Sequence, residues 1–248
     1  MRDLAPIAKA PSLVDQVCSQ LAARLHPSVP PSPSPHSPHT PHSPQSPPPS
    51  RLPSERTLAS QLGVSRSVLR EAIKKLELQG LLEIHQGRGT KIVSQLQKPL
   101  TAALSLLVPD PSSRLAQLFE IRLLLEPESA RLAALRASPT HLQKLDASLH
   151  ALRTAPSLEA AIHADLDFHR ILADASGNKI LLLIIESLAD LLAASHGKGF
   201  QSMSTARSAD MHETILHAIR HRDDSAAETA MQEHLLAARA ALGLPPSP

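Results

Sequence analysis

Histidine and aspartate side chains recur in the second half of the chain at spacings that suit a metal site or a buried polar cluster. Asp165 and His169 are four residues apart and would share one face of a helix. His212 and His234 lie eleven residues on either side of Asp223. If the chain reverses at Asp223, the two imidazoles come level with each other, about 16 Å from the turn at about 1.5 Å per residue. Carboxylates and imidazoles are side chains that hold Zn²⁺, Ni²⁺ or Mn²⁺ in proteins.

The four-residue spacing occurs in further pairs, so it does not by itself select a site. The chain contains 14 histidines, and the competing pairs are His163 with Asp167 and His217 with His221. At about 100° per residue, Asp167 lies about 200° round the helix from Asp165, and His217 lies about 140° from His212. The competing pairs could therefore replace Asp165, His169 and His212 at one site only if both helices were rotated so that their opposite faces pointed into the bundle.

The elements that must position these side chains are helices. Between residues 94 and 248, apolar residues repeat with helical spacing in six segments: 99–108, 113–137, 139–153, 157–175, 178–196 and 205–242. Prolines and Gly177 separate the segments, and the last one is expected to break near Arg222 and Asp223. Short connections imply antiparallel neighbours, so this part is predicted to be an all-α antiparallel helical bundle.

Residues 51–93 have a different organisation, with two short helices followed by a hairpin. Helices are expected over residues 54–62 and 66–79, ended by Gly63 and Gly80, and Ser65 is a suitable N-cap for the second. Strands are expected over residues 81–85 and 90–93, on either side of a turn at 86–89. This order is typical of a winged helix-turn-helix, whose second helix enters the major groove of DNA. The predicted fold class is therefore mainly α, with a small β-hairpin wing before the bundle.

The distribution of charge favours a nucleic-acid contact in the same segment. Residues 51–93 carry eight Lys and Arg against four Asp and Glu, whereas residues 94–248 carry fourteen against seventeen. Ser65, Arg66 and Ser67 occupy the first turn of the second helix, where free amides favour phosphate and arginine reaches guanine edges. Arg70 follows Arg66 by four residues on the same face. The residues expected to pack this helix inward are Val64, Val68, Ala72 and Leu76.

A further helix and an uncharged tract precede this segment. Leu13–Leu25 has helical spacing, with Ser12 as its N-cap. Residues 27–50 hold eleven of the 23 prolines, seven serines and no charged residue. Such a composition cannot bury a core, so an extended or disordered linker is expected there. Loose metal binding by its histidines is the less favoured alternative.

The composition excludes several classes of protein. Hydrophobic residues make up 42% of the 248 residues, yet three are Phe and none is Tyr or Trp, which disfavours a β-sandwich or barrel. The single cysteine excludes a disulfide framework and fits a reducing compartment. The longest apolar run, residues 180–185, is too short to span a bilayer. We therefore expect a cytoplasmic protein with no membrane partner.

Several short motifs follow one another between residues 52 and 90. They are Leu52-Pro53-Ser54-Glu55-Arg56, Leu62-Gly63-Val64-Ser65-Arg66-Ser67, Leu69-Arg70-Glu71-Ala72, Leu76-Glu77, Gly80-Leu81 and Gly87-Arg88-Gly89-Thr90. Together they closely resemble the DNA-binding domain of the GntR family of bacterial transcription regulators. The resemblance implies that Arg56 contacts the DNA backbone or a base, and that Gln86, Gly87 and Arg88 at the wing tip reach the minor groove. A homodimer on a pseudo-palindromic double-stranded operator is expected.

The bundle segment carries a second series of motifs. They are Glu120–Pro127, Asp165–His169, Ala173–Asn178, His212–Ile219 and Met231–Leu235. Their order and spacing resemble the FCD ligand-binding domain of the FadR branch of the GntR family. Many such domains bind a divalent metal through one Asp and three His, which implies Asp165, His169, His212 and His234 here. The ion would be Zn²⁺, with Ni²⁺ or Mn²⁺ as alternatives, and a carboxylate effector or water would complete its shell.

Arg122 and Asn178 are the candidate effector-binding residues. Arg122 lies four residues after Leu118 on the core stripe and needs a carboxylate, either that of Glu126 or that of an effector. Asn178 either contacts the effector or, as we favour, caps the helix that it begins. Since some FCD-like domains bind their effector without metal, the alternative for the histidines is a set of polar contacts inside the bundle.

The sequence thus predicts an effector-responsive transcription regulator, not an enzyme. Residues 1–94 would form the DNA-binding domain with its insert at 27–50, residues 95–242 the effector-binding and dimerisation domain, and residues 243–248 a tail. Subgroup resemblance implies a hydroxy-, keto- or sugar acid as effector, with relief of repression as the commoner outcome. The alternatives are a metal-responsive regulator without organic effector and a metal-dependent hydrolase. No further acid–base residue accompanies the candidate ligands, which weighs against the hydrolase.

Overall fold

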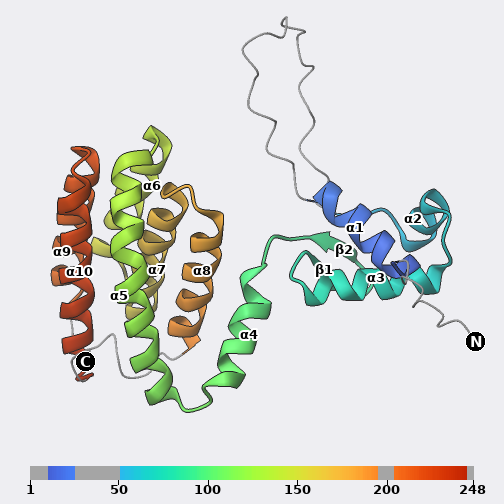
Figure 1. The fold of residues 1–248 in the computed structure, drawn as a ribbon, viewed down its shortest axis with the longest axis horizontal. Helices are drawn as coiled ribbons and strands as arrows, with labels where there is room; N and C mark the ends of the chain where they lie inside the picture. Colours follow the sequence, from blue (N-terminus) through green and yellow to red (C-terminus); the bar gives the residue numbers. More distant parts are fainter. Residues whose placement is uncertain (1–10, 26–50, 195–203, 245–248) are drawn as a thin grey trace, which may run out of the picture. The chain divides into compact units, whose positions relative to one another are not determined.

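The computed structural model describes residues 11–25, 51–194 and 204–244, so the Pro-rich tract at 27–50 lies outside the described residues. The chain divides into two compact units, Met1–Pro99 and Leu100–Pro248, and each is described by itself. Both units are mainly helical, and the strands lie in the first (Figure 1). None of the described helices is long and apolar enough to cross a membrane.

The first unit is a winged helix-turn-helix. Its elements are α1 (Leu13–Leu25), α2 (Glu55–Leu62), α3 (Arg66–Leu78), β1 (Leu82–His85) and β2 (Gly89–Ile92). The strands pair antiparallel, with Leu82 opposite Ile92 and His85 opposite Gly89. Ser54 and Ser65 cap α2 and α3 by accepting hydrogen bonds from the amides of Thr57 and Val68. The helix, turn, helix and hairpin predicted from the sequence are therefore confirmed, with boundaries shifted by one residue.

Gly80 makes the turn from α3 into the wing possible. Its φ is +77°, in the left-handed region that glycine tolerates. A Cβ at this position would overlap the backbone carbonyl of Gln95, whose amide donates to the Gly80 carbonyl at 2.9 Å. The backbone of Gly80, before β1, thus contacts the backbone of Gln95, after β2, and a side chain at Gly80 would prevent this contact.

The core of the first unit lies between α1 and α3. Leu69, Ala72, Ile73 and Leu76 form the buried face of α3 and pack with Val17, Cys18 and Leu21 of α1. The predicted inward stripe is confirmed: Ala72 and Leu76 are buried, and Val64 and Val68 are partly buried and pack against the same core. The face is centred on Leu69 and Ile73, four residues apart, and this leaves the first turn of α3 at the surface.

The second unit is a bundle of antiparallel helices. Its elements are α4 (Gln97–Leu107), which begins just before the boundary, α5 (Pro111–Arg136), α6 (Pro139–Arg153), α7 (Leu158–Ala175), α8 (Lys179–Ala194), α9 (Thr205–Arg220) and α10 (Asp224–Ala241). Pro111 and Pro139 begin α5 and α6, where a missing amide proton costs nothing. Helix α7 packs against α5, α6 and α8, while α9 and α10 pack on each other and on α5. Figure 1 shows helices α5 to α10 beside one another.

The turn between α9 and α10 is hydrogen-bonded to the end of α5. Arg222 has a φ of +58°, a conformation that is uncommon for a residue with a side chain. Its guanidinium donates hydrogen bonds to the carbonyls of Ala134 and Ala137, at the end of α5, at 2.9 and 2.7 Å. The predicted break near Arg222 and Asp223 is therefore confirmed, and it brings α9 and α10 back alongside each other.

Candidate metal centre and DNA-reading surface

Four side chains from three helices of the bundle converge on one buried point. Asp165 and His169 come from α7, His212 from α9 and His234 from α10. One ligand atom from each lies within 4.8 Å of all the others. The exposed fractions of the four residues are 5%, 3%, 0% and 2%, respectively. These four residues, called the histidine cluster below, are the set implied by the family resemblance.

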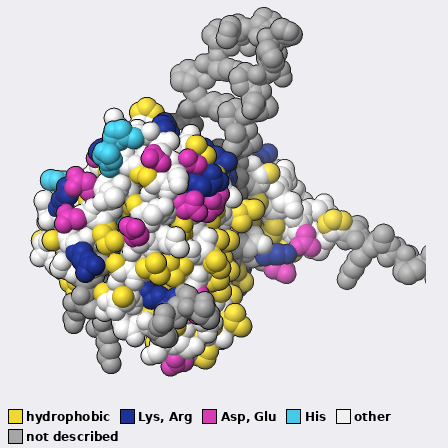
Figure 2. Space-filling model, turned by 60° about the vertical axis from the view of Figure 1, so that its left-hand side comes forward, with side chains coloured by type: hydrophobic (Ala, Val, Ile, Leu, Met, Phe, Trp, Pro, Cys, Tyr) yellow, Lys and Arg dark blue, Asp and Glu magenta, His cyan; other side chains and the backbone are white. Residues whose placement is uncertain are grey.

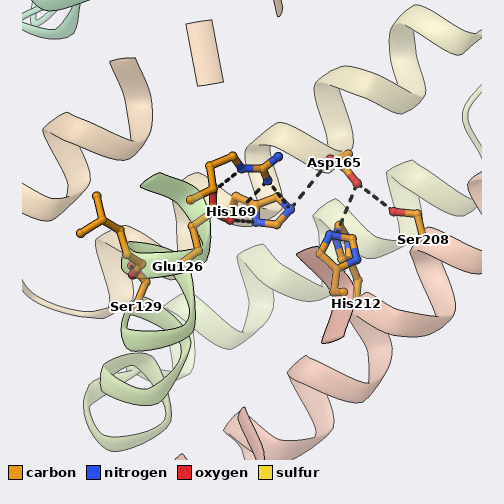
Figure 3. A network of polar contacts seen from close by, with 9 residues as sticks. Glu126, Ser129, Asp165, His169, Ser208 and His212 are labelled. Carbon is orange, nitrogen blue, oxygen red and sulfur yellow. Dashed lines mark hydrogen bonds and ion pairs between the residues drawn. The ribbon is translucent and has the colours of Figure 1, made fainter. Parts of the chain in front are cut away.

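The imidazole nitrogens and the carboxylate oxygens of the histidine cluster face one another. Nε2 of His212 lies 3.3 Å from Nε2 of His234 and 3.5 Å from Oδ1 of Asp165. Nε2 of His169 lies 3.9 Å from Oδ2 of Asp165. Ser208, one turn before His212 on α9, donates a hydrogen bond of 2.8 Å to Oδ1 of Asp165 (Figure 3). The carboxylate is thus held in the cluster by a hydroxyl group.

Burial keeps His212 and His234 in their neutral form. Loss of hydration, reinforced by the neighbouring imidazoles and Arg122, lowers the pKa of both rings well below the ordinary value. A neutral imidazole has a free lone pair, which metal coordination requires. The ring of His212 also stacks on Phe168, with centroids 4.1 Å apart and planes 6° from parallel. Packing therefore sets the plane of this ring.

Arg122, Glu126 and His169 form a chain of contacts that leads into the cluster. Nε of Arg122 donates to Oε1 of Glu126 at 2.5 Å. Oε2 of Glu126 lies 2.5 Å from Nδ1 of His169, and Figure 3 shows these two residues next to each other. Burial opposes ionisation of Glu126, but Arg122 and His169 outweigh it and hold the pKa of this carboxyl well below its usual range. Of the two partners that the sequence left open for Arg122, the structure supplies Glu126.

The donor set fits a divalent metal ion. Nδ1 of His212 and Nδ1 of His234 are buried and have no hydrogen-bond partner among the described residues, so the polar contacts of these rings lie on the cluster side. Three imidazoles and one carboxylate, aimed at one point in a region shielded from water, match the ligand types and number of zinc sites. A carboxylate behind one imidazole is also a usual companion of a metal-bound histidine.

The competing pairs lie at the surface. His163 and Asp167 are exposed on α7, and His217 and His221 are exposed at the end of α9, with ring centroids 4.1 Å apart. The helix-face argument made from the sequence therefore separated the two sets correctly.

Asn178 plays the part of a helix cap. Its side-chain oxygen accepts hydrogen bonds from the amides of Ile180 and Leu181, at 3.1 and 3.2 Å. The residue is exposed, and no contact described for it leads to the histidine cluster. These contacts agree with the prediction that Asn178 caps α8. No described contact supports its prediction as an effector-binding residue.

Sequence reasoning missed three neighbours of the cluster. Glu126 had been considered only as a partner of Arg122, and Ser208 and Phe168 had not been considered. A signal for Ser208 was present, because it precedes His212 by four residues and so shares its helix face. The contact between Glu126 and His169 joins two helices, and no local spacing indicates it.

In the first unit, the candidate DNA-reading residues lie at the surface. Ser65, Arg66, Ser67 and Arg70 are exposed on the first turns of α3, and Arg56 is exposed on α2. Nε of Arg70 lies 3.8 Å from Oε1 of Glu55, a loose surface ion pair. The predicted residues of α3 therefore share one exposed end of the helix.

The wing tip carries the other predicted residues. Gln86, Gly87 and Arg88 are exposed in the turn between β1 and β2. The backbone of Arg51, a residue that the sequence did not indicate, forms an isolated antiparallel β-bridge with Lys91, and its side chain donates a hydrogen bond to the carbonyl of Arg88. The wing tip is thus held by a basic residue that precedes α2.

Comparison with known proteins identifies both units. Residues 43–92 match the family described as "Bacterial regulatory proteins, gntR family", and residues 117–237 match the FCD domain. The HTH-type transcriptional regulator LutR of Bacillus subtilis (strain 168) is 34% identical over 202 residues, covering 76% of this chain and 89% of that protein. The HTH-type transcriptional repressor NanR of Escherichia coli (strain K12) is 32% identical over 192 residues, covering 75% and 73%.

A solved structure extends this similarity to the fold. The structure titled "Streptococcus agalactiae GntR" is 28% identical in sequence, with a TM-score of 0.69, and covers 92% of this chain and 100% of that chain. The chain therefore belongs to the gntR family of bacterial regulatory proteins, carries an FCD domain after its helix-turn-helix, and is a transcription regulator rather than an enzyme.

Proposed function

We propose that this regulator senses a small carboxylic acid at a divalent metal ion in its helical bundle. The observation that carries the proposal is the convergence of four buried ligand atoms within 4.8 Å. Asp165, His169, His212 and His234 hold the ion, which is Zn²⁺, with Ni²⁺ or Mn²⁺ as alternatives. The ion supplies a Lewis-acidic position at which a carboxylate oxygen of the effector binds.

Arg122 supports an anionic effector. Its Nη2 lies 3.5 Å from Nε2 of His169, which places a buried guanidinium next to the histidine cluster. Besides its ion pair with Glu126, the guanidinium would donate a hydrogen bond to an anion held at the metal. We assign the effector to the hydroxy-, keto- or sugar acids, in line with the subgroup resemblance of the bundle motifs.

DNA binding is assigned to residues 1–94, and effector binding and dimerisation to residues 95–242, with 243–248 as a tail. Arg56, Ser65, Arg66, Ser67 and Arg70 would contact bases or phosphates in the major groove, and Gln86, Gly87 and Arg88 the minor groove. A homodimer would read a pseudo-palindromic operator with two such heads. Because NanR of Escherichia coli bears the name of a repressor, we assign repression to this protein as well.

The homodimer would bury apolar side chains that are exposed in a single bundle. On the face of the larger unit in Figure 2, hydrophobic side chains lie between charged ones. The most exposed large apolar side chains of this unit, 72–83% exposed, are Leu106, Leu107, Leu124 and Ile180.

The effector then acts by binding one arrangement of the two DNA-binding heads better than the other, since a ligand without such a preference shifts no equilibrium.

A thermal-shift screen of small organic acids, with and without EDTA, tests the proposed function. We expect one acid class to raise the melting temperature only when the metal is present, because a ligand stabilises the folded state by RT ln(1 + [L]/Kd). At a free acid concentration of about 100 Kd, the gain in unfolding free energy is about 2.7 kcal/mol. Stabilisation by the metal alone, with no acid adding to it, would favour the metal-responsive regulator instead.

Deleting residues 30–48 is expected to leave operator affinity within a few-fold of the parent. The deleted segment carries no charge, so it neutralises no phosphate and adds nothing to the salt dependence of binding. Operator titrations at several salt concentrations measure both quantities. A tenfold loss of affinity or a changed salt slope would make the tract part of the DNA interface.

A further inference from the structure

The two ring nitrogens of His169 face groups of opposite hydrogen-bonding character. On one side, Oε2 of Glu126 lies 2.5 Å from Nδ1. On the other, Nη2 of Arg122 lies 3.5 Å from Nε2. An ionised carboxylate only accepts hydrogen bonds, and a guanidinium only donates them. The two neighbours therefore agree on one tautomer, with the proton on Nδ1 and the lone pair on Nε2.

We infer that Glu126 is the positioning residue of the metal site, which fixes His169 with its Nε2 lone pair directed at the other ligands. The inference rests on the proposed metal site and adds a residue that touches neither the ion nor the effector. A carboxylate behind a ligating imidazole holds the ring orientation and increases its basicity. Glu126 does this from α5, the helix that packs along α7.

Nδ1 makes no hydrogen bond in any of the three imidazoles in the described part of the chain, but only in His169 does a carboxylate oxygen lie 2.5 Å from it. The ring of His212 is oriented by stacking on Phe168. Asp165 is held by the hydroxyl of Ser208. Of the three imidazoles, His169 is thus the one with a carboxylate next to Nδ1, and this contact joins two helices.

Arg122 forms a buried ion pair with Glu126. The two residues are four apart on α5, and their side chains are 7% and 4% exposed. Both guanidinium contacts to the carboxylate, at 2.5 and 3.3 Å, come from the same arginine. Because both side chains are buried, removing one charge leaves the other buried without a partner, which destabilises the folded state. Replacing both residues by apolar side chains leaves no unpaired buried charge.

The test measures Zn²⁺ affinity of the full chain by competition with a chelating indicator. Glu126→Gln is expected to weaken Zn²⁺ binding about 10- to 100-fold, the usual effect of losing a group that orients a metal ligand. Glu128→Gln is the matched control, because Glu128 lies on the same helix but pairs at the surface with Arg131. The double variant Arg122→Met/Glu126→Met, which leaves no stranded charge, is expected to show the same loss while its melting temperature in EDTA stays near that of the parent.

A second measurement reports the tautomer of His169 directly. Nitrogen-15 NMR of the histidine rings reports which nitrogen carries the proton, and His169 is identified by the signal lost in His169→Gln. In the parent, His169 is expected as the Nδ1–H tautomer. Finding Nε2–H there, or equal Zn²⁺ affinity in Glu126→Gln and Glu128→Gln, would overturn the inference and leave the metal site standing. A parent that binds no Zn²⁺ would instead overturn the proposed function.

Discussion

Replacing Arg66 or Arg70 with alanine is expected to weaken specific operator binding strongly while the fold stays intact. Both side chains are exposed on the first turns of α3, and neither belongs to the core of the unit. Each good base contact is worth about 1–3 kcal/mol, or roughly a 5- to 150-fold change in affinity. Gel-shift titration against the native operator measures the loss.

A charge-matched control separates base contact from general electrostatics. Arg153→Ala removes the same charge from a surface helix of the bundle, where Arg153 pairs with Glu213. We expect this variant to bind the operator as the parent does. Unchanged affinity in Arg66→Ala or in Arg70→Ala would show that the residue concerned does not read DNA.

Replacing His212 with alanine is expected to remove the metal and, with it, the response to the effector. His212 is fully buried, and its Nε2 approaches both His234 and Asp165. Losing a direct ligand should cost more than the about 10- to 100-fold that follows loss of an orienting partner. Elemental analysis of the two purified proteins, each then titrated with organic acids, measures the metal content and the response.

The control for this variant lies on the same helix. His217→Ala removes an exposed imidazole outside the histidine cluster and should leave one metal ion per chain. DNA binding without effector should survive in both variants, whereas misfolding would abolish it together with the metal. Equal metal content in His212→Ala and the parent would exclude His212 from the site. No metal in either, with the response intact, would make Arg122 the main partner of the carboxylate.

Helical geometry explains why the histidine cluster could be predicted. The spacing of Asp165 and His169 lies within one helix, and His212 and His234 lie on two arms of one tight hairpin. In both cases the regular rise and rotation of the helix carry the prediction over the whole distance. The exposed positions of His163 and His217 follow from the same rotation.

Side-chain contacts between different helices could not be predicted from the sequence. The position of Glu126 behind His169 depends on how α5 packs along α7, and the stacking of Phe168 on His212 depends on α7 and α9. Neither arrangement leaves a periodic signal in the sequence. On α3, the sequence predicted Ala72 and Leu76 in the core correctly but did not indicate Leu69 and Ile73, because the position of α1 decides which further residues are covered.

The fastened turn between α9 and α10 restricts how this hairpin can evolve. His212 and His234 are 22 residues apart, and Arg222 ties the turn between them to the end of α5. One residue inserted in either helical arm would rotate the imidazole beyond it by about 100° and move it by about 1.5 Å. Substitutions can accumulate here, but insertions and deletions break the cluster. An ungapped interval between these histidines should therefore mark homologues that keep the site, and chimeric regulators should exchange α9 and α10 as one block.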